Sequence, residues 1–278
     1  MTPSEIDVSV IIPTFRRVAD LRRTLVHIAM CQPKPAECIV HVDAGDEETC
    51  KFLSEEFPAI RTIVSKTRQG PGGGRNKLFS FATHEVVVSL DDDSWPMNKC
   101  FFADAVASLK ATPSVAVLGC RIFESDGSTG ILPGPLHNVV EPQTFCAAGF
   151  VGCGAVVRKS AFLQTRGYLP LPEAYGMEEA DMTLQLLALD WHLQQAVHLQ
   201  VCHACDRSSH HASAKINAAH IRNTALLAFL RYPISKYPLG FMQVANRVLF
   251  CLRKRRFRGI LNGLTSIVPT AWRYRKFR

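Results

Sequence analysis

A five-residue apolar run that ends in three consecutive aspartates constrains the fold of this chain more than any other segment. Val86–Leu90 is short, rich in β-branched residues and soon followed by Pro96, which predicts a buried strand. Asp91, Asp92 and Asp93 then lie at the carboxyl end of that strand, the edge where open α/β sheets bind ligands. Clustered carboxylates repel one another, and Mg²⁺ or Mn²⁺ relieves the repulsion. A solvated acidic turn or a helix N-cap is the alternative.

Apolar and amphipathic segments alternate through the first half of the chain. This alternation predicts a doubly wound, mostly parallel α/β sheet. Polar residues stand where strands end, among them Thr14, Asp43 and Arg75, and they indicate a nucleotide pocket. Strands are predicted at 8–12, 38–42, 60–64, 86–90 and 115–120, helices at 19–30, 47–57, 77–83 and 97–111, and a glycine-rich loop at 70–76.

Several motifs, taken in order, resemble glycosyltransferase family 2 enzymes with a GT-A fold, over about residues 7–230. The similarity is closest to the rhamnosyltransferase-like branch of bacterial surface-glycan and polysaccharide biosynthesis enzymes. The segments that carry it are Val8–Phe15, Val42–Gly45, Gly74–Asn76, Leu90–Asp93 (the DXD motif), Gly176–Leu184, His203 and Arg222-Asn223.

The resemblance implies inverting, metal-dependent transfer of a hexosyl or deoxyhexosyl group from a nucleotide-diphosphate sugar to a glycan or lipid-linked acceptor. It places Thr14 and Asp43 at the base, and Arg16 and Arg75 at the nucleotide or its phosphates. Asp91, Asp92 and Asp93 would form the ribose-diphosphate and metal site. Asp91 and Asp93 would be metal ligands, Asp93 the more direct one, with His203 as a third.

The catalytic base is expected at the start of a helix after residue 177. Glu178 and Glu179 match the family's Glu-Asp pair, so Glu179 takes the base position, where a glutamate is a departure from the family pattern. Asp181 matches a following acidic position and is the other candidate. Acidic residues also stabilise a helix N-terminus through the helix dipole, so simple capping is the alternative to a catalytic role.

A second hypothesis for the region after residue 201 is a zinc site. Cys202, Cys205, His210 and His211 have the right ligand types, although four ligands within ten residues leave little loop between them. Such a site would suit a non-enzymatic nucleic-acid-binding protein. A nucleotidyltransferase is the other enzymatic alternative, but it needs a Gly-rich loop after the first strand, where this chain has Pro13-Thr14-Phe15.

The charge divides sharply along the chain. Residues 1–206 hold 17 Lys or Arg and all 24 Asp or Glu, a net charge of −7, whereas residues 207–278 hold 15 Lys or Arg and no acid. We expect a GT-A domain at 1–232 and a basic amphipathic helical extension at 233–278. Apolar residues beside arginines predict an anionic membrane surface as a partner. No recognisable nucleic-acid fold accompanies them, which disfavours nucleic acid.

The remaining features concern compartment and acceptor. No run of about 18 apolar residues and no signal-like N-terminus is present, and the ten cysteines are scattered, so we expect a reduced, cytoplasmic protein, peripheral on the inner face of the cell membrane. Residues 124–144 are predicted as a long loop over the site and 149–157 as a strand whose glycines allow a ligand to approach or form a bulge.

Overall fold

The computed structural model describes residues 5–128, 144–169, 171, 176–204 and 213–278. The chain divides into two compact units. The first comprises residues 1–172 and 186–205, and the second comprises residues 173–185 and 206–278. The predicted domain boundary after residue 232 falls inside the second unit. The long loop predicted at 124–144 lies largely outside the described residues, between 129 and 143.

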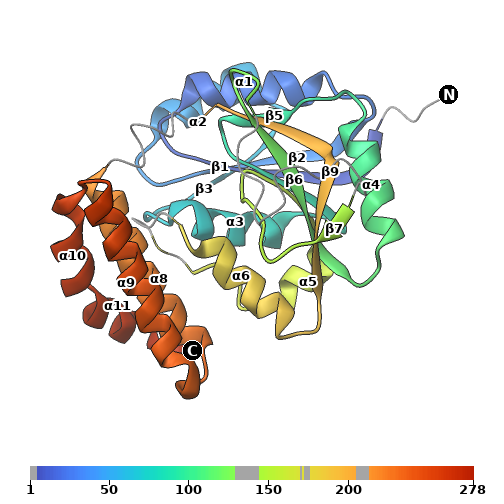
Figure 1. The fold of residues 1–278 in the computed structure, drawn as a ribbon. Coiled ribbons are helices and arrows are strands. Elements are labelled where there is room, and N and C mark those ends of the chain that lie inside the picture. Colours follow the sequence, from blue (N-terminus) through green and yellow to red (C-terminus); the bar gives the residue numbers. More distant parts are fainter. Residues whose placement is uncertain (1–4, 129–143, 170, 172–175, 205–212) are drawn as a thin grey trace. The chain divides into compact units, whose positions relative to one another are not determined.

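The N-terminal half of the first unit is a parallel sheet with helices on both faces (Figure 1). Its four strands are adjacent in the order β3-β2-β1-β4. Figure 1 shows α1 and α3 on opposite sides of the sheet, as right-handed crossovers in opposite directions require. The elements are β1 (Glu5–Thr14), α1 (Val18–Ala29), β2 (Lys34–Val42), α2 (Glu47–Glu56), β3 (Arg61–Val64), α3 (Gly70–Phe81) and β4 (Val86–Leu90).

The sheet continues beyond β4 with mixed pairing, in the order β8-β6-β9-β5, and β7 pairs with β9. Strand β8 is antiparallel to both β4 and β6, whereas β6 and β9 are parallel. The predicted α/β class is thereby confirmed. The added elements are β5 (Ser94–Pro96), α4 (Phe101–Ala111), β6 (Val115–Glu124), β7 (Thr144–Cys146), β8 (Gly154–Arg158), α5 (Lys159–Leu163) and β9 (His192–His203).

The core explains why these segments become strands and helices. Alternate residues of β1 and β4, such as Val8, Val10 and Val88, are fully buried in one apolar cluster that also receives the inner face of α1. Burial of apolar side chains from both layers is the main favourable contribution to folding.

The prediction of a loop at 70–76 is wrong, because these residues form the first two turns of α3. Pro71 stands in the first turn, where its missing N–H costs nothing. Gly74 is needed for packing, because a Cβ at this position would lie 2.6 Å from His41 Nδ1. The strand predicted at 149–157 begins only at Gly154, where a Cβ would lie 2.7 Å from Ile122 Cδ1. Close packing between strands accounts for that glycine.

The second unit is helical, as predicted for the C-terminal extension. Its central helix α8 is largely buried, and α9, α10 and α11 pack against it. Within the described part of the chain, no helix combines the length and hydropathy needed to cross a bilayer. The elements are α6 (Glu178–Leu187, of which residues 178–185 belong to this unit), α8 (Ala214–Arg231), η1 (Ile234–Lys236), α9 (Tyr237–Arg253), η2 (Phe257–Gly259), α10 (Ile260–Thr265), α11 (Ile267–Tyr274) and η3 (Arg275–Phe277).

Candidate active site

The carboxyl ends of β1, β2 and β4 place the predicted polar residues along one edge of the sheet. These strands are parallel neighbours, so Thr14, Asp43 and the aspartates after Leu90 leave the sheet on the same side. The end of β9 reaches the same place by an antiparallel pairing with β5, in which His203 lies opposite Ser94. The backbone N–H of Ala204 donates to the carbonyl oxygen of Asp93 at 2.9 Å, which fixes His203 beside the aspartates.

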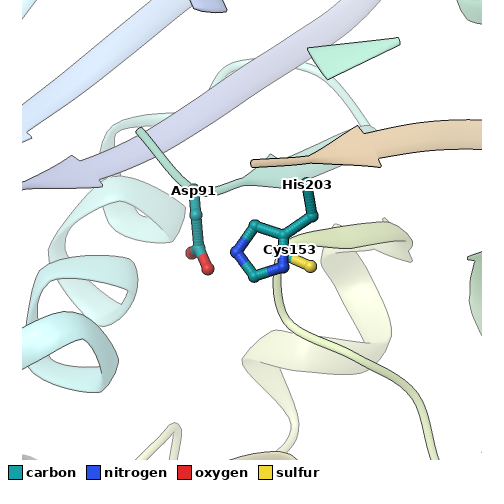
Figure 2. A group of neighbouring side chains, drawn as sticks. All are labelled: Asp91, Cys153 and His203. Carbon is teal, nitrogen blue, oxygen red and sulfur yellow. The ribbon is translucent and has the colours of Figure 1, made fainter. Parts of the chain in front are cut away.

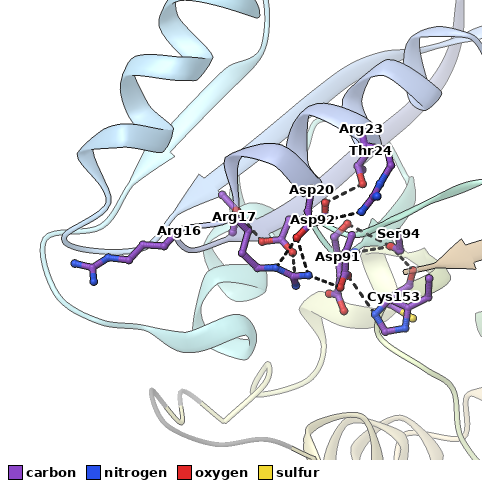
Figure 3. A network of polar contacts seen from close by, with 12 residues as sticks. Arg16, Arg17, Asp20, Arg23, Thr24, Asp91, Asp92, Ser94 and Cys153 are labelled. Atoms are coloured by element: carbon purple, nitrogen blue, oxygen red, sulfur yellow. Dashed lines mark hydrogen bonds and ion pairs between the residues drawn. The ribbon is translucent and has the colours of Figure 1, made fainter. Parts of the chain in front are cut away.

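Arg17 neutralises two of the three aspartates (Figure 3). Its Nη1 lies 2.9 Å from Asp92 Oδ1, and its Nη2 lies 2.7 Å from Asp93 Oδ2. Thr14 Oγ1 donates to the other oxygen of Asp92 at 2.8 Å. Burial raises the pKa of Asp92 to about 7 despite Arg17 and Thr14, because the neighbouring carboxylates also oppose its ionisation. Asp92 is therefore a buried, fully partnered group that supports the loop.

Asp93 has the opposite electrostatic balance. Burial alone would raise its pKa, but the hydrogen bond and charge of His203, together with the charge of Arg17, lower the pKa of Asp93 to about 2. Its Oδ1 lies 3.2 Å from His203 Nε2. Asp93 thus stays ionised at neutral pH, with one oxygen directed at a histidine nitrogen that can also bind a cation.

Asp91 is the most accessible of the three, with 32% of its side chain exposed. Arg75, anchored at Nε to Ser89 Oγ at 3.1 Å, donates from Nη2 to Asp91 Oδ1. Figure 2 shows the carboxylate of Asp91 facing the ring of His203, with the sulfur of Cys153 next to them. The potential ligand atoms of Asp91, Cys153 and His203 all lie within 4.8 Å of one another.

This cluster satisfies the chemical requirements of a divalent-cation site. Carboxylate oxygens suit Mg²⁺ and Mn²⁺, and an imidazole nitrogen is acceptable to Mn²⁺. The Oδ1 atom of Asp93 is buried and has His203 Nε2 as its neighbour at 3.2 Å. The residues present therefore fit a divalent metal: Asp91, Cys153 and His203 lie within 4.8 Å of one another, and Asp93 adjoins His203.

The predicted nucleotide contacts occupy the neighbouring strand end. Asp43 is buried and accepts backbone N–H groups from Gln69 at 2.9 Å and Gly70 at 3.0 Å, so it organises the start of α3. Arg16 is exposed, with a φ of 57°, and its N–H donates to Asp46 Oδ2 at 2.5 Å. That backbone conformation directs the guanidinium of Arg16 away from the aspartates in Figure 3.

The three candidate bases at the start of α6 differ in their burial and in the contacts they make. Asp181 is completely buried and forms a two-point ion pair with Arg231, at 2.5 Å and 3.1 Å, while Gln185 donates to it at 2.8 Å. Glu178 is also buried, whereas Glu179 is half-buried. Both carboxylate oxygens of Asp181 are occupied by Arg231 and Gln185, so the structure favours a structural role for Asp181.

The zinc interpretation extends beyond the described residues, because Cys205, His210 and His211 lie there. Cys202 is buried in β9 opposite Trp95, and burial raises the pKa of its thiol. A raised pKa disfavours the thiolate that zinc requires. His203 instead faces the aspartates.

The family model for glycosyl transferase family 2 matches residues 9–164, more than half of the chain. The chain belongs to glycosyl transferase family 2. The matched segment contains all three aspartates, Arg75 and Cys153, so most of the described cluster lies within the part of the chain that defines the family.

One characterised glucosyltransferase shares sequence with part of the chain. A GalNAc(5)-diNAcBac-PP-undecaprenol beta-1,3-glucosyltransferase from Campylobacter jejuni is 33% identical over 89 residues, which cover 31% of this chain and 29% of that protein. The chain thus matches less than a third of the length of this curated relative.

Solved glycosyltransferase structures extend the similarity to nearly the whole chain. The mannosyltransferase PcManGT from Pyrobaculum calidifontis, in complex with GDP-Man and Mn²⁺, has a TM-score of 0.62 at 18% identity, covering 95% of this chain and 75% of its own. S. aureus TarS 1-349 with UDP-GlcNAc has a TM-score of 0.61 at 14% identity, covering 98% and 92%. The predicted GT-A fold of this family 2 protein is confirmed.

Three polar residues of the site were not predicted from the sequence. Arg17 stands beside the predicted Arg16, and a left-handed residue at position 16 determines which of the two arginines meets the aspartates. Cys153 is one of ten scattered cysteines in the sequence, and only its neighbours in the structure distinguish it. Arg231 is 50 residues from Asp181. In the sequence, the single clue is that three adjacent carboxylates require basic partners.

Proposed function

We propose that this chain is an inverting, metal-dependent glycosyltransferase that takes a hexosyl or deoxyhexosyl group from a nucleotide-diphosphate sugar. The observation that carries the proposal is that Asp91 and His203 lie together at the carboxyl edge of the sheet, with Asp93 Oδ1 3.2 Å from His203 Nε2. PcManGT was solved with GDP-Man and Mn²⁺, and GalNAc-T7 with UDP, GalNAc and Mn²⁺, which supports a nucleotide-sugar donor and a divalent metal here.

In this proposal each residue of the edge has a separate task. Asp91, Asp93 and His203 hold Mn²⁺ or Mg²⁺, and the bound cation offsets negative charge on the leaving diphosphate. Thr14 and Asp43 line the pocket for the base, Asp92 supports the ribose-diphosphate side, and Arg16 contacts the nucleotide. Arg75 contacts phosphate, because it reaches Asp91 from the wall of the site.

The chemical step is a direct displacement. The acceptor hydroxyl oxygen forms a bond to the anomeric carbon while the bond from that carbon to the diphosphate oxygen breaks. The hydroxyl proton passes to Glu179, and the bond electrons leave with the nucleoside diphosphate. We assign the base to Glu179 because Asp181 is neutralised by Arg231 and Glu178 is more deeply buried.

We further propose a glycan or lipid-linked acceptor and work at the cytoplasmic face of the cell membrane. The Campylobacter relative is named for an undecaprenol-linked acceptor, and the C-terminal unit supplies positive charge for an anionic leaflet. The similarity to the rhamnosyltransferase-like branch favours surface-polysaccharide synthesis as the setting.

A thermal-shift panel of UDP-, GDP- and dTDP-sugars, each with and without Mn²⁺, tests this function. A ligand at 100 times its Kd stabilises the folded state by about 2.7 kcal/mol, so the correct donor raises the Tm visibly. We expect a shift that needs both one nucleotide sugar and Mn²⁺, followed by transfer to a glycan or polyprenyl-diphosphate glycan. Zinc that is tightly bound in the purified protein, with no response to any nucleotide sugar, would instead identify the metal-stabilised binding protein.

A further inference from the structure

The second unit contains an apolar groove that the proposed chemistry does not use. Its volume is about 460 Å³, within the range of about 300–1,000 Å³ of small-molecule sites. Helices α8, α9 and α11 form it. Small residues are part of its lining, among them Ala225, Ala228 and Gly240. A Cβ on Gly240 would lie 2.5 Å from Ala228 Cβ, so α8 and α9 pack closely at that point.

The rim of the groove exposes large apolar side chains. Phe241 of α9 is 74% exposed, and Val268 and Trp272 of α11 are 76% and 68% exposed. Apolar side chains this accessible beside a concave apolar lining mark an interaction site rather than an ordinary surface. Within the described residues of the second unit, these apolar side chains remain exposed.

Charge at the mouth identifies the partner. Arg275 lines the groove, its guanidinium carbon lies 4.0 Å from the centroid of the Trp272 ring, and its Nη1 donates to the Trp272 carbonyl at 2.6 Å. Arg273, Lys276 and Arg278 stand beside it, and residues 207–278 contain no acid at all. The acidic residues of this unit lie within 173–185 and at position 206, and Asp181 among them is paired with Arg231. Arg275 therefore offers positive charge to a phosphate.

The lining itself argues against an extended peptide. Its one hydroxyl, on Tyr237, already donates to the Phe229 carbonyl at 3.4 Å. An extended peptide in this groove would bury backbone N–H and C=O groups without partners, which is costly, whereas a hydrocarbon chain brings no such groups. Tryptophan at the rim is typical of sites where hydrocarbon meets polar headgroups.

We propose that this groove binds one hydrocarbon chain of a phosphate-bearing lipid, with the phosphate at Arg275. The chain lies against the small residues of α8 and α9, between Phe241 and Val268. The inference goes beyond the transferase function and does not rest on it, because binding requires neither donor nor metal. It also differs from adsorption to an anionic surface, because the groove is one saturable site that selects for chain length.

Titration of full-length protein with alkyl phosphates below their micelle concentrations tests the proposal. We expect dodecyl phosphate to bind with a stoichiometry of one by calorimetry. The affinity should fall steeply for decyl and octyl phosphate, by roughly fourfold for each lost buried methylene. Inorganic phosphate should bind undetectably, and dodecyl maltoside, which lacks the charge, should bind at least tenfold more weakly than dodecyl phosphate. Affinity that does not depend on chain length would overturn the proposal.

Matched variants separate the groove from general apolar adsorption. Val268→Asn and Phe241→Asn alter exposed residues, so the fold should tolerate them, and each should weaken dodecyl phosphate at least tenfold. Leu261→Asn is the control, because Leu261 is 71% exposed in the same unit but does not line the groove. Arg275→Gln should weaken dodecyl phosphate but not dodecyl maltoside, and the exposed Arg253→Gln should change neither.

Three results would contradict the proposal. Equal losses in Leu261→Asn and Val268→Asn would indicate adsorption to any exposed apolar residue. Equal losses in Arg275→Gln and Arg253→Gln would show that net charge alone attracts the lipid. A dimer in sedimentation velocity that Val268→Asn dissociates, and that dodecyl phosphate leaves intact, would show that a second copy of the chain occupies the groove.

Discussion

At the residue scale, Arg17 gives the acidic cluster its internal order. By pairing with both Asp92 and Asp93, it leaves Asp93 Oδ1 directed at His203 and leaves Asp91 to Arg75. The three adjacent carboxylates thus have different environments. Asp92 is buried and stabilises the loop, Asp93 is buried and ionised, and Asp91 is the most accessible. A cation at Asp91, Asp93 and His203 would not have to displace Arg17 from Asp92.

The first prediction concerns the ionised ligand. Asp93→Asn removes negative charge with little change of shape, and we expect Mn²⁺-dependent nucleotide binding to weaken by at least about 10–100-fold, a loss seen even for supporting residues of metal sites. Isothermal titration of UDP or GDP with and without Mn²⁺ measures it. Asp20→Asn is the control, because Asp20 is another partner of Arg17 but lies outside the cluster. Normal Mn²⁺ dependence in Asp93→Asn would remove Asp93 from the ligand set.

The second prediction separates the candidate bases. Glu179→Gln should slow single-turnover transfer by roughly 10²–10⁴-fold, the usual contribution of a positioned base, and leave donor binding unchanged. Asp181→Asn breaks a buried ion pair with Arg231 and should lower the free energy of unfolding by about 3–5 kcal/mol. Urea denaturation beside single-turnover kinetics distinguishes them. A slow but stable Asp181→Asn would transfer the role of base to Asp181.

At the scale of helices and strands, features set by interactions between residues near in sequence can be predicted, and features set by distant residues cannot. Strands such as Val86–Leu90 are encoded by local apolar runs, and their order along the chain predicts parallel pairing. The sequence predicts a loop at 70–76 because glycine disfavours helices locally, whereas the structure has the start of helix α3 there. Only the packing against His41 reveals why Gly74 is a glycine. The sequence places the candidate ligands Asp91, Asp93 and His203 at strand ends, and the structure finds them there. Arg17 meets Asp92 across 75 positions of sequence, which no local pattern encodes.

The third prediction tests that packing argument. Gly74→Ala adds helix propensity worth about 1 kcal/mol, but its Cβ would meet the buried ring of His41, which is held by Ser65 at 2.6 Å. We expect overpacking to dominate and lower the free energy of unfolding by about 1–3 kcal/mol. Gly149→Ala, where nothing lies within 4 Å of the added Cβ, should be nearly neutral. A Gly74→Ala protein more stable than wild type would show that α3 shifts freely.

At the scale of the whole molecule, the two ends of the chain carry opposite net charge. The chain up to residue 206 carries a net charge of −7 and contains the acidic cluster, while the rest carries 15 positive charges and no negative one. Truncation near Tyr237 is a poor test of the basic region, because α9, α10 and α11 cover the buried helix α8. Substitutions on the exposed surface keep that core intact.

The fourth prediction therefore neutralises charge without removing structure. Replacing the exposed residues Arg247, Arg253, Lys254 and Arg258 by Gln should cost about 1 kcal/mol each in binding to anionic vesicles, a combined loss of roughly 10³-fold at low salt. The loss should shrink as salt screens the surface charge. Co-sedimentation with phosphatidylserine-containing and neutral vesicles measures it. The matched control neutralises the same number of exposed lysines in the first unit, Lys34, Lys51, Lys66 and Lys110. If both sets reduced pelleting equally, net charge would govern adsorption, and the basic C-terminal region would have no special role at the membrane.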